Sequence, residues 1–117
     1  MKFDPNIPIY LQIMDDFKKG IISGLYPPAS KVASVRELAV TYGVNPNTVQ
    51  RALAELERTG MVRSERTSGR FITNDDELIK TLRQEVALAQ VKHFLQECEA
   101  MGLGQQEIKD ILATQWD

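Results

Sequence analysis

Cysteine and histidine are almost absent from this sequence of 117 residues, in which Cys98 and His93 are the only examples. A single cysteine cannot form an internal disulfide, and two such side chains are too few for a structural zinc site. No apolar run approaches the roughly 20 residues that cross a bilayer, and the first residues lack the apolar core of a signal peptide. We therefore expect a cytoplasmic protein with no disulfide, no metal or other cofactor, and no membrane partner.

Catalytic signatures are missing as well. The sequence has no glycine-rich phosphate-binding loop and no nucleophile motif, and His93 has no partner at a catalytic spacing. We therefore expect no enzymatic activity. What the sequence does contain is 43% hydrophobic and 26% charged residues, which is ordinary for a soluble globular protein of one domain with or without a short appendage.

The charges are distributed unevenly along the chain. Residues 1–73 contain ten Lys and Arg against seven Asp and Glu, whereas residues 74–117 contain four against nine. The first part is therefore net +3 and the second net −5, within a total charge of −2. A basic first part indicates that it meets a polyanion, although chance clustering of solvated charges would give the same count.

Apolar periodicity and capping residues predict three helices in the basic part, over residues 9–24, 34–42 and 46–59. The first is preceded by a proline and closed by a glycine. The second begins at Ser34 with a glutamate in the capping-box position, and the third begins at Asn45, followed by a proline. Because the turn between the last two helices is short, they have the dimensions of a helix-turn-helix.

In a helix-turn-helix the second helix enters the major groove of DNA, and its N-terminal residues reach bases and phosphates. That end of the predicted third helix carries amide, hydroxyl and guanidinium groups on Asn45, Asn47, Thr48, Gln50 and Arg51. Amide side chains present a donor beside an acceptor, which matches the edge of adenine. For Asn45, a plain helix cap is an equally good interpretation.

Residues 61–73 alternate in hydropathy around a turn and predict a β-hairpin. Its tip brings two guanidinium groups around small residues, in the order Arg66, Thr67, Ser68, Gly69 and Arg70. Such a tip alone is typical of a solvated turn, but after three helices it predicts the wing of a winged helix. The expected fold class is mainly α with a small β-hairpin: a winged helix-turn-helix DNA-binding domain over residues 1–73, then a two-helix dimerisation tail over residues 74–117.

The tail is predicted as a long helix that ends at about Ala100 and a short helix over residues 105–115, with Trp116 on its apolar side. Apolar residues of the long helix form two rotated stripes, too wide a surface for one covering partner. A single winged helix offers too little contact for tight, selective binding, so we expect a homodimer. The expected interface residues are Ile79, Leu82, Val86, Ala89, Phe94, Ile108 and Leu112. Cys98 fits a small buried apolar group better than a redox sensor.

Several ordered motifs resemble the GntR family of bacterial transcription regulators. They are PIYLQI at 8–13, IISGLY at 21–26, SVRELA at 34–39, VNPNTVQRA at 44–52, and GMV followed by GRFIT within 60–73. The NPNTVQRA string and the short tail are similar to the small YtrA-like branch. The resemblance covers nearly the whole chain and implies a winged-helix DNA reader with a helical dimerisation segment, often a repressor of transport genes or of its own operon.

By this resemblance, Arg36, the amide-rich start of the third helix and the wing contact the two-fold operator in double-stranded DNA. The sequence departs from the family pattern at Ala29 and Ala33, where glycine and proline are usual, and at Pro46, where larger relatives often carry arginine or serine. A winged helix that serves as a protein-interaction adaptor is the alternative, and the acidic total charge suits it. Whether a small-molecule effector exists is left open, since His93, Phe94 and Trp116 fit core or interface better than a pocket.

Overall fold

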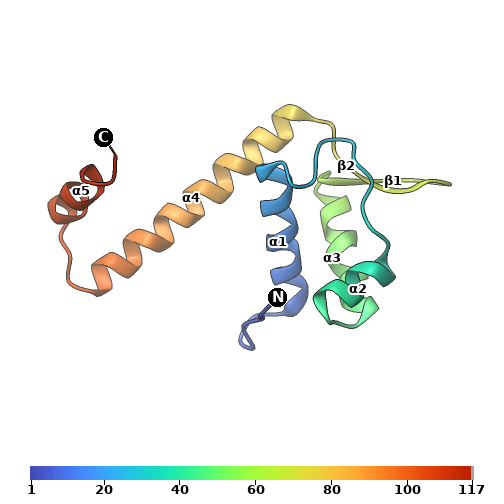
Figure 1. Cartoon of the computed structure of the whole chain (residues 1–117), viewed down its shortest axis with the longest axis horizontal. Helices are drawn as coiled ribbons and strands as arrows, with labels where there is room; N and C mark the ends of the chain where they lie inside the picture. The colour runs from blue at the N-terminus through green and yellow to red at the C-terminus, as the bar shows by residue number, and fades with distance from the viewer. Residues whose placement is uncertain (117) are drawn as a thin grey trace. The chain divides into compact units, whose positions relative to one another are not determined.

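The structure, a computed structural model of the chain, describes residues 1–116. Its elements are α1 (Ile9–Ser23), α2 (Val35–Tyr42), α3 (Pro46–Arg58), β1 (Val62–Glu65), β2 (Gly69–Ile72), α4 (Asp76–Ala100) and α5 (Gln105–Ala113) (Figure 1). The fold is mainly helical with one antiparallel hairpin, as the sequence predicted.

The chain divides into two compact units, Met1–Arg83 and Gln84–Asp117, and α4 contributes residues to both. The first two turns of α4 therefore belong to the unit that contains the three N-terminal helices and the hairpin. The sequence assigned this whole helix to the tail, and the domain boundary expected after residue 73 stays a prediction. No helix in the described part of the chain is long and apolar enough to cross a membrane.

The core of the first unit lies where α1 and α2 pack against α3. The apolar residues that the 3.6-residue period placed on one face of each helix are the buried ones, among them Ile13, Phe17, Ile21, Leu38, Val49, Leu53 and Leu56. The Tyr42 hydroxyl donates a hydrogen bond of 2.8 Å to Asp16 and so ties α2 to α1. Burial and this bond to a carboxylate raise the pKa of Tyr42 above its ordinary value.

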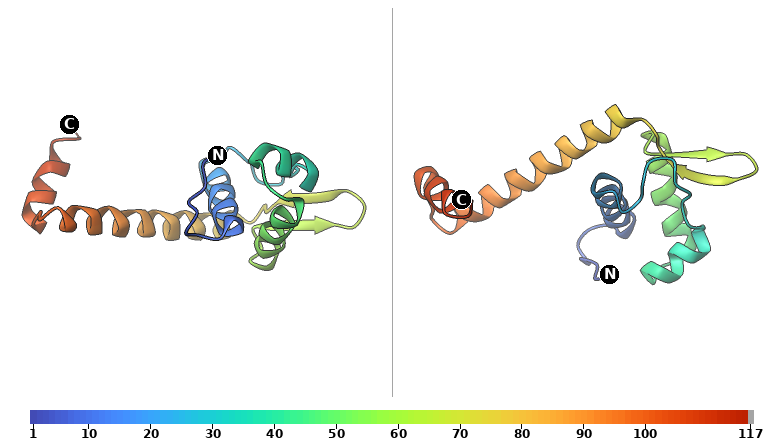
Figure 2. Two further views of the ribbon diagram at one scale, coloured as in Figure 1. Left: turned by 90° about the horizontal axis from the view of Figure 1, so that it is seen from below. Right: turned by 45° about the horizontal axis from the view of Figure 1, so that its top comes forward.

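The hairpin acquires a third extended segment that the sequence did not reveal. β1 pairs with β2 with Val62 opposite Ile72, and on the other edge of β2 Lys31 forms an isolated bridge with Phe71. Two backbone hydrogen bonds flank the bridge: Val32 N–H to the Arg70 carbonyl at 2.9 Å, and Ile72 N–H to the Ser30 carbonyl at 2.8 Å. The segment between α1 and α2 is therefore anchored to the wing, which projects beyond the helices (Figure 2).

Ala29 begins this anchored segment in a left-handed conformation, with φ of +65°. It is the only non-glycine residue with positive φ in the described part of the chain, and its N–H donates to the Ile72 carbonyl at 3.1 Å. An L-residue with a Cβ pays about 1–2 kcal/mol for this conformation. The departure from glycine noted in the sequence thus leaves the backbone path in place at a cost in strain.

Replacing Ala29 by glycine is expected to stabilise the protein by about 0.5–1 kcal/mol, since relief of strain exceeds the added entropy of the unfolded chain. Urea unfolding followed by circular dichroism measures the change. Ala33→Gly is the matched control, because Ala33 lies in the same segment without positive φ and should lose stability. Equal or lower stability of Ala29→Gly would contradict the assignment of strain.

The second unit is a small helical hairpin built from the later part of α4 and from α5. Cys98 and Ile108 are buried in it, so the expectation of a buried, apolar Cys98 is confirmed. The Glu107 carboxylate accepts a hydrogen bond from Gly104 N–H at 3.1 Å, which fixes the start of α5. The predicted last helix was too long: α5 ends at Ala113, and Trp116 follows it with 74% of its surface exposed.

Candidate nucleic-acid interface

The start of α3 presents two amide side chains to solvent. Asn47 and Gln50 are exposed, while Val49 and Ala52 between and beyond them are fully buried and fix the helix against the core. Residues three apart lie on the same side of a helix, so both amides share one exposed face. Thr48 lies at the edge of this face, half-buried. The geometry therefore offers paired donors and acceptors on a rigid element, which is what reading base edges requires.

Asn45 has a structural role at this end of α3. Its side-chain oxygen accepts a hydrogen bond of 2.8 Å from the Asn47 N–H, which is the geometry of a helix cap. The cap interpretation of Asn45 is thus confirmed, and one side-chain acceptor is occupied. Pro46 occupies the first helical position, where the missing N–H costs no intrahelical bond.

The Arg51 side chain stacks on an aromatic ring. Its guanidinium carbon lies 3.8 Å from the centre of the Tyr10 ring of α1. Stacking uses one face of the guanidinium group and leaves its N–H edges to donate, an arrangement that suits a phosphate oxygen. Tyr10, in the motif PIYLQI, therefore supports the Arg51 side chain, a role that the sequence did not reveal.

Arg36 lies in the first turn of α2 and is exposed, with no ion pair among residues 1–116. The residue beside it is already engaged: the Ser34 hydroxyl accepts from the Glu37 N–H at 3.1 Å and lies 3.0 Å from the Glu37 carboxylate. The predicted cap at Ser34 is therefore present, and Glu37 meets the Ser34 hydroxyl rather than its backbone N–H. Ser34 caps the N-terminus of α2, and Arg36 is the exposed cation in the first turn of that helix.

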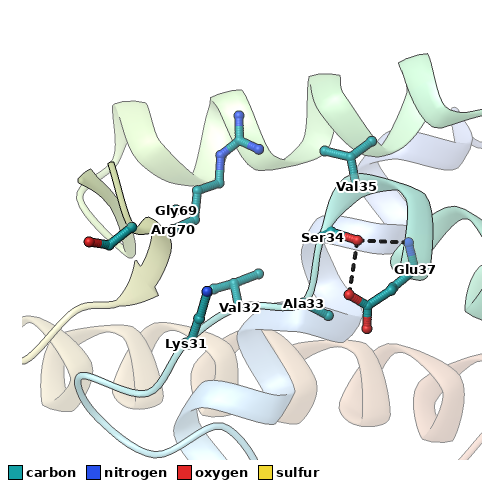
Figure 3. Close-up of a pocket in the computed structure, with 9 residues that line it drawn as sticks. Lys31, Val32, Ala33, Ser34, Val35, Glu37, Gly69 and Arg70 are labelled. Carbon is teal, nitrogen blue, oxygen red and sulfur yellow. Dashed lines mark hydrogen bonds between the residues drawn. The ribbon is translucent and has the colours of Figure 1, made fainter. Parts of the chain in front are cut away.

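The wing carries fewer available cations than the sequence suggested. Arg66, Thr67 and Ser68 form the exposed turn, and Gly69 follows with φ of +101°. Arg70 does not join them at the tip: its guanidinium group extends back toward α3 (Figure 3), where it pairs with Glu57. Arg63 pairs with Glu65 on the same strand, β1. The expectation of two guanidinium groups at the tip is corrected by this, because Arg70 satisfies a carboxylate within the fold.

Glu57 is the centre of a small polar cluster under the wing. It accepts from Arg70 and, at 2.7 Å, from the Ser64 hydroxyl. These two donors lower the pKa of Glu57 below its ordinary value, so the carboxylate is charged at neutral pH. The cluster joins both strands of the hairpin to α3 and fixes how the wing stands on that helix.

Between the wing and α2 the surface is hollowed into an open groove of about 590 Å³ (Figure 3). One wall is the segment from Lys31 to Val35 at the start of α2, and the other is formed by Ser68, Gly69 and Arg70. Lys31 belongs to the basic part of the sequence, which gives no sign that this residue lies near the wing. Only the pairing of its segment with β2 brings it to the wing. No three His, Cys, Asp or Glu side chains gather as metal ligands within residues 1–116.

The predicted dimer-interface residues separate into two groups. Ile79 and Leu82 are 6% and 4% exposed in the first unit, and Ile108 is buried in the second. Val86 and Leu112 are half-buried, whereas Ala89 and Phe94 are exposed. The first turns of α4 thus cover the chain's own core, which corrects the expectation that Ile79 and Leu82 face a partner. The large apolar residues exposed in the tail are Leu88, Val91, Phe94, Met101, Ile111 and Trp116, of which Phe94 belongs to the predicted interface.

Comparison with known proteins decides the family. A family model described as "Bacterial regulatory proteins, gntR family" matches residues 9–72, which include α1 to α3 and the hairpin. The chain belongs to the GntR family. Its curated relatives in Bacillus subtilis include the uncharacterized HTH-type transcriptional regulator YhcF, 34% identical over 97% of this chain and 93% of that protein. The HTH-type transcriptional repressor YtrA is 37% identical over 83% of this chain and 74% of that protein.

Solved structures of GntR proteins share the fold. A GntR family transcriptional regulator from Listeria monocytogenes superposes with a TM-score of 0.85 at 36% identity, covering 96% of this chain and 98% of that one. The structure described as AraR(DBD) in complex with operator ORR3 has a TM-score of 0.55 at 26% identity, over 62% of this chain and 86% of that one. The winged-helix fold predicted from the sequence is therefore confirmed, and the GntR resemblance with it.

Proposed function

We propose that this GntR-family chain is a sequence-specific, cytoplasmic transcription repressor that binds a two-fold DNA operator as a homodimer. The observation that carries the proposal is the exposed pair Asn47 and Gln50 on a helix whose opposite face is fully buried. Asn45, Thr48 and Arg51 of α3, Arg36 of α2 and the wing turn at 66–69 complete the reading surface. Arg70 acts indirectly, since it positions the wing through Glu57.

The relatives support this proposal. YtrA is named a transcriptional repressor, and AraR(DBD) has been captured with an operator. We assign the same class of partner, double-stranded DNA, to this chain. A protein-interaction adaptor would need no exposed amide pair at the start of α3.

The homodimer is assigned to the second unit. Leu88, Val91 and Phe94 recur every three residues on one side of α4 and are all exposed. Covering about 500 Å² of apolar surface per subunit, at roughly 25 cal/mol per Å², yields on the order of 12 kcal/mol before the costs of association. A second copy supplies that cover, and it also supplies the second reading helix that a two-fold operator requires.

Fluorescence anisotropy with a labelled duplex from upstream of the chain's own gene tests the proposal. Affinity should fall with salt, by about 0.9 in log K per neutralised phosphate for each decade of concentration. Affinity for the upstream duplex should also exceed that for a scrambled duplex of equal length. No binding at low salt would favour the adaptor and reject the DNA reader.

Arg36→Ala should weaken binding of the dimer by about a hundredfold on both duplexes, because a charge-assisted hydrogen bond to phosphate contributes about 1.5 kcal/mol and both copies lose it. The salt slope should also drop by about 0.9 per subunit. Lys19→Ala is the control: it removes an equal charge from α1, where Lys19 pairs with Asp15 at 3.1 Å, and should leave binding unchanged. Loss of folding in Arg36→Ala, seen by circular dichroism, would make Arg36 a structural residue and overturn its assignment.

A further inference from the structure

We propose that Lys31, in the segment before α2, is a further ligand of the DNA backbone that contacts a phosphate in the groove beside the wing. The proposal rests on the proposed DNA-binding function and adds a residue from outside the helix-turn-helix and the hairpin. The sequence predicted two cations at the wing, Arg66 and Arg70. Because Arg70 pairs with Glu57, Lys31 takes the place of the second one.

Lys31 is fixed to the wing through its backbone. It bridges Phe71, and the next residue, Val32, donates to the Arg70 carbonyl at 2.9 Å. The position of Lys31 is therefore set by β2 and not by the flexibility of a loop. When the hairpin contacts DNA, Lys31 is therefore brought close to the same DNA.

The Lys31 side chain lies beside the wing at Gly69, which has no side chain. Its Cε lies 3.4 Å from the point at which a Cβ of Gly69 would stand. The aliphatic stem thus lies beside the glycine, and the exposed side chain lines the groove beside the wing. Gly69 closes the turn with φ of +101°, a conformation that residues with a side chain rarely adopt.

The charges around the groove leave Lys31 without an internal partner. Arg63 and Arg70 are neutralised by Glu65 and Glu57, whereas Lys31 is exposed and forms no ion pair within the described residues. The one carboxylate that lines the groove, Glu37, lies at its α2 end and is engaged by the Ser34 hydroxyl. An anion would therefore lie at the wing end, between Lys31 and Ser68.

A DNA phosphate fits this groove better than a free anion. The groove is open, contains one unpaired cation and also contains a carboxylate, so it lacks the convergent donors that hold a small anion by themselves. A phosphodiester of DNA needs fewer donors at this point, because α3 and the wing turn already bind the rest of the duplex. Lys31 then adds one ion pair to a strand that passes between them.

Lys31→Gln tests the proposal, measured with the upstream duplex and with an unrelated duplex of equal length at low salt. We expect about fivefold weaker binding to both duplexes and a salt slope lower by about 0.9 per subunit, since phosphate contacts carry no sequence information. Lys31→Arg should restore both quantities. Lys19→Gln is the control and should match the wild type.

Arg70→Gln separates the two wing cations. It should lower the stability to urea, because Glu57 loses its partner, whereas Lys31→Gln should leave that stability unchanged, since Lys31 is exposed and forms no ion pair within the described residues. If Lys31→Gln binds DNA as tightly as the wild type with the same salt slope, the Lys31 assignment is overturned while the DNA reader stands. If the wild type itself fails to bind any duplex, both the Lys31 assignment and the proposed DNA-binding function are wrong. If inorganic phosphate at millimolar concentration raises the melting temperature of the wild type but not of Lys31→Gln, the groove is a small-anion site and the DNA assignment is wrong.

Discussion

Replacing Asn47 and Gln50 together by alanine is expected to remove sequence discrimination, with affinity for the specific operator falling at least a hundredfold. Each amide that makes a bidentate contact to a base contributes about 1–3 kcal/mol of discrimination, and a two-fold complex contains every contact twice. Affinity for unrelated DNA should change little, because it depends on phosphate contacts from Arg36 and the wing. The specific and non-specific dissociation constants should therefore converge.

Competition anisotropy measures both constants for the double variant and the wild type at one salt concentration. Gln90→Ala is a matched control, since it deletes an exposed amide from α4 and should keep full discrimination. Folding should be intact in all variants, because Asn47 and Gln50 are exposed and the cap is supplied by Asn45. Unchanged discrimination in the double variant would show that other groups read the operator.

Most of the fold could be predicted because its signals are local. Ser34 and Asn45 cap α2 and α3 as expected, and Gly24 and Gly43 end the preceding helices in left-handed conformations. Each of these residues acts on its own neighbours within a few positions. The helix bounds found in the structure therefore lie within two residues of those predicted.

The parts of the site that the sequence missed depend on partners far along the chain. Lys31 reaches the wing only because its segment pairs with Phe71, and Arg70 turns away from the tip because Glu57 lies on α3. A composition count treats these two cations alike, although one is neutralised and one is not. The same reason explains the tail: periodicity shows that Ile79 is buried, but not that its own unit buries it.

Replacing Val91 by glutamate is expected to separate the proposed dimer into folded monomers. Val91 is 52% exposed in the single chain and lies between Leu88 and Phe94 in the row of exposed apolar residues on α4. In the dimer this substitution would remove apolar burial worth about 1.5 kcal/mol or more per subunit and place a carboxylate in an apolar contact. Because both copies change, the loss should reach about 4 kcal/mol, which raises the dimer dissociation constant about a thousandfold.

Sedimentation velocity over a range of concentrations measures the change, and the anisotropy assay should show weaker operator binding, since each monomer then binds one half-site alone. Gln96→Glu is the matched control, because it adds the same charge to an exposed position on α4 outside that row and should leave the dimer intact. The monomer should stay folded, since glutamate favours helix at least as well as valine and Val91 contributes little to the core of the single chain. A Val91→Glu protein that remains a dimer would place the interface elsewhere, and one that unfolds would show that the single chain buries this row itself.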